Sequence, residues 1–459
     1  MKLSTKNVLV LVVCCFSMLV VGCKKSSTSN YNVSVTVSGL VGTGLVLQLN
    51  NADNLAIYAN GVSTFSGQLQ NTNTYAVSIL TSPGLPQQFC TLANATGTIA
   101  SASVTNITVT CSPVEFAYIV NQGIQTIAPF VINQTTGALV SEGPSVSTGN
   151  SPVALALDST GRYAYAVNNV DNTVSSYLGN PSTALWVSAG MAVSSSPLMS
   201  PDPKGIVVDP SSKFVYVANS AVNTISGFNI STTTAAITCF GIASNVCPSI
   251  PTATTGNGPT GLAAAQSNGN SYLYATNFTH DNVSQYLINA TTGALTPMGT
   301  APAGHNPTAI ILSPTMKNAV GTFGPFLFVL NSTDNSISGY SISAGVLVST
   351  GTPVNSGGSG LAAIAVSSSG FAYVVNATSG TIAAYSVSIG GALTGLGAPV
   401  ATGNNPVSVS VDSKGTFAYV ANEGDNSISI YPINANGTLG AATTQMVGSQ
   451  PVVVMTSLN

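Results

Sequence analysis

The 459-residue sequence predicts an all-β protein in which a seven-bladed β-propeller follows a small β-sandwich. Three observations support this fold class. One short segment recurs seven times after residue 115. Helix-favouring Glu, Lys, Arg and Gln are scarce, whereas strand-favouring Val, Ile, Thr and Tyr abound. The array of repeats also begins and ends with two incomplete pieces that complement each other.

The recurring segment alternates aromatic, small and aliphatic residues and ends in asparagine. Its seven copies are FAYIVN (116–121), YAYAVN (163–168), FVYVAN (214–219), YLYATN (272–277), FLFVLN (326–331), FAYVVN (371–376) and FAYVAN (417–422). The asparagines of successive copies are 45 to 58 residues apart, a length that suits one four-stranded blade. The recurrence therefore predicts seven blades.

The ends of the array predict how the ring closes. The first copy, at 116–121, has no apolar innermost strand before it, whereas the chain ends in an unpaired apolar segment at 451–458. Together these segments make one complete blade. We therefore expect a 3+1 closure, in which the C-terminal strand pairs with the first repeat and leaves no open sheet edge.

Short loops of the form Gly-x-x-Pro lie between the repeats. They are GNSP (149–152), GNGP (256–259), GHNP (304–307), GNNP (403–406) and GSQP (448–451). With these loops, residues 114–459 resemble the YVTN-type propellers of the lactonase-like superfamily. The resemblance implies the fold more strongly than an activity, because that family includes phosphogluconolactonases, surface-layer proteins and exported proteins with no known reaction.

Residues 1–23 resemble a bacterial lipoprotein signal peptide. Two lysines precede an apolar stretch from Val8 to Val21, which is shorter than the roughly 20 residues of a membrane-spanning helix. The stretch leads into Gly-Cys, and the resemblance implies that Cys23 is acylated and becomes the N-terminus. We expect a cell-envelope protein that this lipid anchors in the outer membrane, on its periplasmic or its surface side. The alternative is an ordinary signal peptide that contains Cys23.

Two segments precede the propeller. Residues 24–30 form a polar tether, and residues 31–112 carry alternating apolar runs that Gly, Asn and Pro turns separate. Short strands with such turns predict a small β-sandwich of immunoglobulin-like type.

Four cysteines remain once the signal segment is removed and Cys23 carries lipid. They allow three pairings, and proximity in the sequence favours the disulfides Cys90–Cys111 and Cys239–Cys247 in an oxidising compartment. The second disulfide would stiffen an insertion at 237–250, which could serve as a recognition element or be no more than a stapled loop.

Charged residues make up only 5% of the chain, with 9 basic and 12 acidic side chains. No basic patch is present, so we expect no nucleic-acid partner. Propeller geometry puts the Gly-x-x-Pro loops and the turns after each asparagine on one face, where acidic side chains collect. The candidate ligand funnel on this face comprises His280, Asp281, His305, Asp334, Glu423 and Asp425.

The two histidines of the chain both fall in this funnel. His280 and His305 come from adjacent blades and could meet near Asp281 and Asp334, as metal ligands or as acid and base. The simpler interpretation makes both histidines solvated loop residues, because Asp-Asn suits tight turns. No known catalytic motif supports the site, so we predict no catalytic residue, no metal and no cofactor.

Two further features have alternative interpretations. The repeated asparagines could line a funnel for a neutral sugar or peptide, but asparagine at a strand end more often bonds the backbone of its own turn. Trp186, the only tryptophan, lies in an irregular stretch and could make a surface contact.

The first functional expectation is a lipid-anchored envelope protein that uses its propeller as a non-catalytic binding or scaffold platform for a protein or glycan. The alternatives are a lactonase-type hydrolase similar to 6-phosphogluconolactonases and a carbohydrate-binding surface protein. A phosphorylated lactone needs cationic groups to hold its phosphate, and the funnel face offers only Lys204. The cytosolic family members also meet their substrate inside the cell, whereas this chain is expected to be exported.

Overall fold

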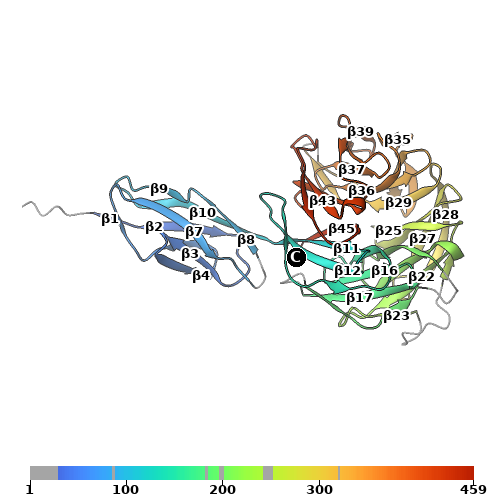
Figure 1. Ribbon diagram of the computed structural model, residues 1–459, viewed down its shortest axis with the longest axis horizontal. Helices are drawn as coiled ribbons and strands as arrows, with labels where there is room; N and C mark the ends of the chain where they lie inside the picture. The colour runs from blue at the N-terminus through green and yellow to red at the C-terminus, as the bar shows by residue number, and fades with distance from the viewer. Residues whose placement is uncertain are drawn as a thin grey trace, which may run out of the picture. The chain divides into compact units, whose positions relative to one another are not determined.

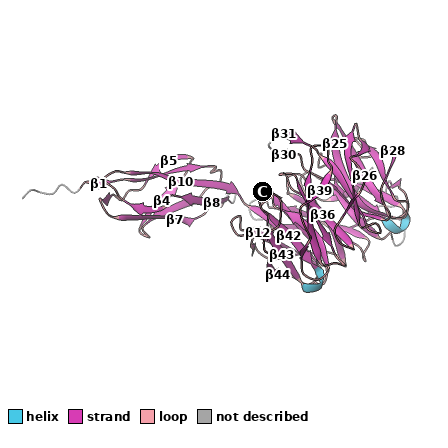
Figure 2. Ribbon diagram, turned by 90° about the horizontal axis from the view of Figure 1, so that it is seen from above, coloured by secondary structure: helices cyan, strands magenta, loops and turns pink. Residues whose placement is uncertain are grey.

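The computed structural model describes residues 29–84, 88–180, 185–195, 201–240, 252–318 and 321–458. They form two compact units, a smaller one within residues 29–111 and a larger one that runs from Ser112 to the end of the chain. Nearly all regular structure is strand, as Figure 2 shows. Within these residues no helix is long and apolar enough to cross a membrane. The predicted lipid site at Cys23 lies outside them.

The smaller unit is a β-sandwich of two four-stranded sheets. One sheet contains, in order, β5 (Gly61–Thr64), β2 (Val33–Ser38), β10 (Val104–Pro113) and β8 (Gln88–Ala93); the other contains β4 (Asp53–Ile57), β3 (Leu45–Leu49), β7 (Thr74–Thr81) and β9 (Thr96–Thr98). A short pair, β1 (Asn30–Tyr31) and β6 (Leu69–Gln70), accompanies them. Alternating apolar residues of both sheets share one core. The immunoglobulin-like type stays a prediction.

A disulfide joins Cys90 in β8 to Cys111 in β10, which is the pairing expected from the sequence. Both cysteines are buried in the core of the sandwich. Cys239 is also disulfide-bonded. Its expected partner, Cys247, lies outside the described residues, so that pairing stays a prediction.

The larger unit contains seven β-sheets, the blades of a propeller. Blade 1 has β45 (Pro451–Leu458), β11 (Glu115–Asn121), β12 (Thr126–Ile132), β13 (Leu139–Ser141) and β14 (Val146–Ser147); blade 2 has β15 (Pro152–Leu157), β16 (Tyr163–Asn168), β17 (Thr173–Gly179), β18 (Trp186–Ser188) and β19 (Val193–Ser194). Blade 3 has β20 (Pro203–Val208), β21 (Phe214–Asn219), β22 (Thr224–Ile230), β23 (Ile237–Cys239) and β24 (Thr252–Thr254); blade 4 has β25 (Pro259–Ser267), β26 (Asn270–Asn277), β27 (Asn282–Ile288) and β28 (Leu295–Pro302).

The remaining three blades follow the same plan. Blade 5 has β29 (Pro307–Leu312), β32 (Phe326–Asn331), β33 (Ser336–Ser343), β34 (Val346–Ser349) and β35 (Val354–Asn355), with the hairpin β30 (Met316–Asn318) and β31 (Gly321–Phe323) inserted after its first strand. Blade 6 has β36 (Leu361–Val366), β37 (Phe371–Asn376), β38 (Thr381–Val387), β39 (Leu393–Gly395) and β40 (Val400–Ala401); blade 7 has β41 (Pro406–Val411), β42 (Phe417–Asn422), β43 (Ser427–Pro432) and β44 (Thr443–Met446). The 3-10 turns η1 (Ser220–Val222) and η2 (Glu423–Asp425) follow the second strands of blades 3 and 7.

The C-terminal strand closes the ring. β45 pairs antiparallel with β11, from Glu115 opposite Leu458 to Asn121 opposite Pro451, and Figure 1 shows the two strands side by side. The 3+1 closure predicted from the two incomplete repeats is therefore confirmed. Its effect is that residues separated by almost the whole propeller sequence share one hydrogen-bonded sheet.

The second aromatic of the repeat connects neighbouring blades. The hydroxyl of Tyr165 donates to the carbonyl of Ala235 at 3.1 Å, and that of Tyr216 donates to Gly293 at 2.7 Å in the next blade. Tyr274 makes the equivalent bond to blade 5. Burial raises the pKa of all three tyrosines, so their hydroxyls stay protonated as donors. These aromatics pack between blades and are not available to stack on a sugar.

Trp186 is also buried, on the boundary between blades 1 and 2. Its indole stacks on the ring of Tyr118 with centroids 3.8 Å apart. The suggestion that Trp186 makes a surface contact is therefore wrong. Trp186 is the first residue of a short strand, β18, which the sequence pattern did not indicate, and it is the buried residue of that strand.

A buried carboxyl lies beside the ring closure. Glu115 begins β11, is only 1% exposed, and accepts hydrogen bonds from the backbone N–H and the hydroxyl of Ser413 in blade 7, at 2.6 and 3.0 Å. Burial raises the pKa of Glu115 to about 7, and the nearby charge of Asp412 adds to the effect. The contact between the first and last blades therefore contains a group that titrates near neutral pH.

We expect Glu115→Gln to flatten the pH dependence of the propeller's stability. The folded protein keeps the Glu115 proton up to about pH 7, whereas the unfolded chain releases it near pH 4.5. The stabilisation from this carboxyl is therefore fully present below pH 4.5 and is lost as the pH rises through 7, by about 3 kcal/mol in all. Glutamine has no proton to lose over this range, so the unfolding free energy of the Glu115→Gln variant should fall less as the pH rises.

Denaturant unfolding at several pH values measures this effect. Trp186 fluorescence reports on the propeller alone, because it is the only tryptophan in the chain. Glu423→Gln removes one carboxylate from the turn η2 and serves as the control. Equal pH dependence in the natural protein and Glu115→Gln, or equal flattening by the control, would contradict the assignment.

Candidate active site

The asparagine at the end of each second strand shapes the face that carries the candidate site. Asn168 accepts the backbone N–H of Gly149 at 2.9 Å and donates to the hydroxyls of Thr173 and Ser175. The same side chain recurs, fully buried, in Asn219, Asn277, Asn331, Asn376 and Asn422. A Cβ on Gly149 would lie 2.7 Å from the Asn168 amide carbon, so the loop must begin with glycine. Asn331 and Asn422 bond the loop and the next strand as Asn168 does, whereas Asn219 and Asn277 bond the next strand, so these asparagines are structural without bonding the backbone of their own turn.

A second contact links five of the seven blades to the next. In these blades the residue four positions after the asparagine has a positive φ, and its side-chain oxygen accepts an N–H from the third loop residue of the following blade. Asn172 binds Asp202 N at 3.3 Å, and Asn223 binds Gly258 N at 2.8 Å. The same contact occurs at Asp281 with Asn306, Asn335 with Gly360 and Asn426 with Gln450. Blade 4 alone among these five uses a carboxylate.

A third contact holds the loops of blades 2, 5 and 7 against their own blades. Asn150 donates its backbone N–H and its side-chain amide to the two carboxylate oxygens of Asp171, both at 2.7 Å. Asn404 and Asp425 repeat this bidentate contact at 2.6 and 2.7 Å. In blade 5 a histidine replaces the asparagine.

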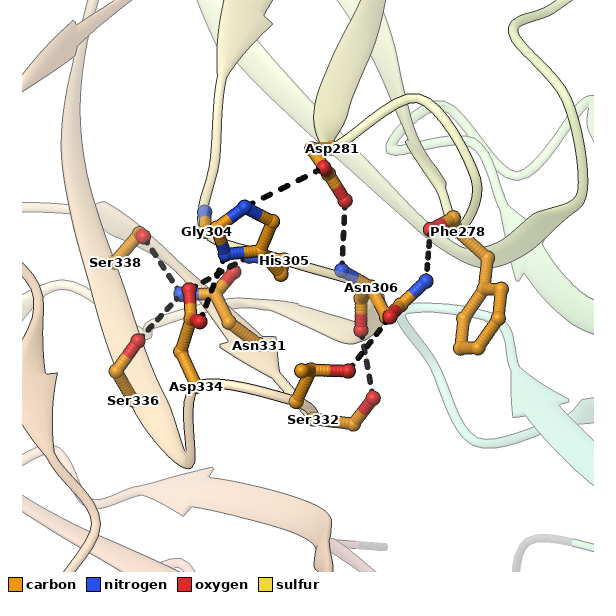
Figure 3. Close-up of polar contacts among 11 residues, drawn as sticks. Phe278, Asp281, Gly304, His305, Asn306, Asn331, Ser332, Asp334, Ser336 and Ser338 are labelled. Atoms are coloured by element: carbon orange, nitrogen blue, oxygen red, sulfur yellow. Dashed lines mark hydrogen bonds and ion pairs between the residues drawn. The ribbon is translucent and has the colours of Figure 1, made fainter.

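His305 makes the same bidentate contact with Asp334. Its backbone N–H donates to one carboxylate oxygen at 2.7 Å and its Nδ1 lies 2.8 Å from the other. Because a carboxylate only accepts, Nδ1 carries the proton, and Nε2 is the basic nitrogen of the neutral ring. Figure 3 shows Nε2 directed toward Asp281, whose oxygen is 4.0 Å away. The side chain of His305 is 67% exposed, so a ligand can reach it.

The two carboxylates control the charge of this imidazole. The hydrogen bond that His305 donates to Asp334, together with the charge of Asp334, raises the pKa of His305, and the charge of Asp281 adds to the rise. The backbone and side-chain hydrogen bonds from His305 in turn lower the pKa of Asp334. The result is a cluster of one imidazole and two carboxylates from two adjacent blades.

The loop that carries His305 is fixed by its next residue. Asn306 donates its backbone N–H to Asp281 and its side-chain amide to the carbonyl of Phe278, both at 2.8 Å. Its amide oxygen accepts the hydroxyl of Thr333 at 2.6 Å, and its carbonyl accepts that of Ser332 at 2.9 Å. Figure 3 shows these contacts around His305. The imidazole is therefore presented from a rigid support.

Three of the six predicted funnel residues come together, and three do not. His280 instead accepts the backbone N–H of Asn257 at 3.1 Å, and no hydrogen bond or ion pair joins the two histidines in the described chain. Glu423 and Asp425 hold loop residues of blade 7. Within the described ranges, no three His, Cys, Asp or Glu side chains are placed so that they could hold a metal ion together.

Inspection of the sequence alone missed the support residues Asn306 and Thr333. A signal for the site itself was available, because aligning the five Gly-x-x-Pro loops shows histidine at position 305 where three of the other four have asparagine. Among the residues four positions after each repeated asparagine, Asp281 is the only acidic one.

Comparisons with known proteins agree on the architecture. The profile of the family described as lactonase, 7-bladed beta-propeller matches residues 202–358 and 319–456, which together make up more than half of the chain. A proposed 6-phosphogluconolactonase from Bacteroides uniformis is similar in structure, with a TM-score of 0.62, 20% identity, and coverage of 75% of this chain and 100% of that protein.

Two further structures are similar at comparable levels. A proposed 6-phosphogluconolactonase from Bacteroides fragilis has a TM-score of 0.61 at 18% identity over 75% of this chain and 98% of its own. The periplasmic gluconolactonase of Pseudomonas aeruginosa has a TM-score of 0.57 at 16% identity over 74% and 99%. At sequence identities this low, the structural similarity establishes a common fold and no more. No curated protein matches the sequence.

We expect the imidazole of His305 to titrate above the usual pKa of 6.5, because Asp334 and Asp281 favour its cation. Asp334→Asn should lower the pKa of His305 toward 6.5, and Asp281→Asn should lower it by a smaller amount. Proton NMR of the imidazole signals measures this, in a His280→Asn background that leaves one histidine. A His305 pKa at or below 6.5, or one that Asp334→Asn leaves unchanged, would contradict the electrostatic account.

Proposed function

The chain belongs to the lactonase family of seven-bladed β-propellers, and from this premise we propose that it hydrolyses lactones with His305 as general base. The observation that carries the proposal is the geometry of His305, whose Nδ1 is held by Asp334 while Nε2 stays accessible. The family match and the similar structures support this hydrolase alternative better than the non-catalytic platform first expected from the sequence.

The proposed reaction opens a cyclic ester with water. Nε2 of the neutral imidazole takes a proton from a water molecule as the water oxygen attacks the lactone carbonyl. Asp334 keeps the ring in the required tautomer, and both carboxylates stabilise the imidazolium that forms. When the tetrahedral intermediate collapses, the ring C–O bond breaks and the imidazolium returns its proton to the leaving oxygen. The product is a hydroxy acid, and His305 is regenerated.

The charges around His305 favour a lactone without a phosphate. Asp281 and Asp334 flank the imidazole, and both would repel a phosphoryl group. Lys204, the one base assigned to this face, pairs with Asp202 at 3.0 Å. We therefore propose a neutral sugar lactone as the substrate class, in contrast to the phosphorylated substrate named for the two Bacteroides proteins.

We also propose, from the sequence segment that ends at Cys23, that the protein works outside the cytoplasm. Export at first argued against an enzyme of this family. The similar Pseudomonas aeruginosa protein is described as a periplasmic gluconolactonase, which supports lactone hydrolysis as a compatible function for an exported propeller. A lipid anchor at Cys23 and an outer-membrane location are part of the same proposal.

His305→Asn should lower kcat/KM for glucono-1,5-lactone about 100-fold or more, because it removes the general base. Asparagine occupies the same position in blades 2 and 7, so the variant should keep the loop contact with Asp334. The natural rate, corrected for spontaneous hydrolysis, should rise with pH and level off above the pKa of His305. Asp281→Asn should move this inflection to lower pH. A pH-stat assay of acid release measures both effects.

The matched control is Asp425→Asn, which alters the equivalent carboxylate of blade 7 and should leave turnover unchanged. Turnover that survives in His305→Asn would show that the base has been misassigned. A higher kcat/KM for the 6-phosphorylated lactone would overturn the substrate class but not the hydrolase. No turnover of any lactone by the natural protein would overturn the hydrolase and return the propeller to a binding role for a protein or glycan.

A further inference from the structure

A pocket lies at the opposite end of the blades from His305. It has a volume of about 480 Å³, and the hairpins that join the first two strands of blades 2 and 3 line it. A hydrogen bond of 3.2 Å between the hydroxyls of Ser159 and Ser212 ties the two hairpins together. The pocket is thus formed by two equivalent elements of adjacent blades.

Both hairpins supply a cation to this pocket, Arg162 from blade 2 and Lys213 from blade 3. Only five basic residues occur in the described ranges, so two of the five line one pocket. Arg162 and Lys213 each lie directly before the first aromatic residue of the second strand of their blade. At this position the other blades have Glu115, Ser271, Pro325, Gly370 and Thr416. The pairing of cations therefore occurs at one blade boundary and is not a general property of the repeat.

The acids beside these two cations are held by hydrogen bonds of their own hairpins and form no ion pair with them. Asp158 accepts the N–H of Tyr163 at 2.8 Å and the N–H and hydroxyl of Thr160, which use both of its oxygens. Asp209 is similarly engaged by the N–H groups of its own hairpin and by a serine hydroxyl. In the part of the chain that the structure describes, no carboxylate lies within ion-pair distance of either cation.

The remaining walls of the pocket suit an anion. The hydroxyl-bearing residues Thr160, Ser211 and Ser212 line it beside the cations. The Arg162 guanidinium lies 5.6 Å from the centre of the Tyr163 ring, which restrains its position. A guanidinium and an ammonium with adjacent hydroxyls provide the charge-assisted donors that bind phosphate or carboxylate oxygens.

We propose that this pocket is a binding site for a small oxyanion, the phosphate or carboxylate group of a soluble metabolite. It is separate from the proposed lactonase site, since it lies on the opposite face and uses none of that cluster's residues. The volume accommodates a ligand the size of a monosaccharide derivative. The proposal does not depend on lactone hydrolysis.

Isothermal titration of the whole protein with inorganic phosphate, glucose 6-phosphate and gluconate, at low salt, tests the site. We expect saturable binding that weakens as salt is added. Arg162→Gln and Lys213→Gln should each weaken it about tenfold or more, because each removes a charge-assisted contact. Lys213→Arg should retain binding, since it preserves the charge. Tighter binding of the phosphates or of gluconate identifies which oxyanion the site takes.

Lys414→Gln is the matched control, because Lys414 lies on the corresponding hairpin of blade 7 but outside the pocket. It should bind the anions as the natural protein does. The proposal is overturned if no anion binds at millimolar concentrations. It is equally overturned if Arg162→Gln and Lys213→Gln bind normally with Trp186 fluorescence unchanged, or if the control loses as much affinity as they do.

Discussion

The hydrogen bonds of the buried asparagine at the end of each blade's second strand are the interaction on which the rest of this propeller depends. In blades 2, 5 and 7 the amide of Asn168, Asn331 or Asn422 accepts the N–H of the loop glycine and donates to two hydroxyls of the neighbouring strand. In these three blades the contact accounts for the glycine in the loop and the two hydroxyl residues in the third strand, and it fixes the position of the loop.

The candidate active site follows from exceptions to this regular framework. His305 uses the contact that asparagine makes in blades 2 and 7, and Asp281 uses the contact that asparagine makes in four other blades. Neither substitution requires a new backbone conformation. Two titratable groups could therefore be placed within 4.0 Å of each other at little cost to the fold. The proposed acid–base chemistry therefore depends on two substitutions within structural contacts that the repeat already makes.

Scarcity of charge gives each ionisable residue unusual weight in this protein. Most acidic groups serve turns, such as Asp158 and Asp209 on one face and Asp171 and Asp425 on the other. The other ionisable residues with a role described above are His305 with its two carboxylates, the cations Arg162 and Lys213, and the buried Glu115. Because few other charges screen them, local contacts decide their titration and their ligands.

The sequence by itself determined the number of blades, the 3+1 closure and the pairing of Cys90 with Cys111, because these follow from periodicity, from incomplete ends and from proximity along the chain. It also placed His305, Asp281 and Asp334 on one face. Only the tertiary structure separated them from His280, Glu423 and Asp425, and only it buried Glu115 and Trp186. The reason is physical: a repeat specifies contacts within its own blade, whereas the meeting of Asp281 with His305, or of Arg162 with Lys213, depends on how adjacent blades pack.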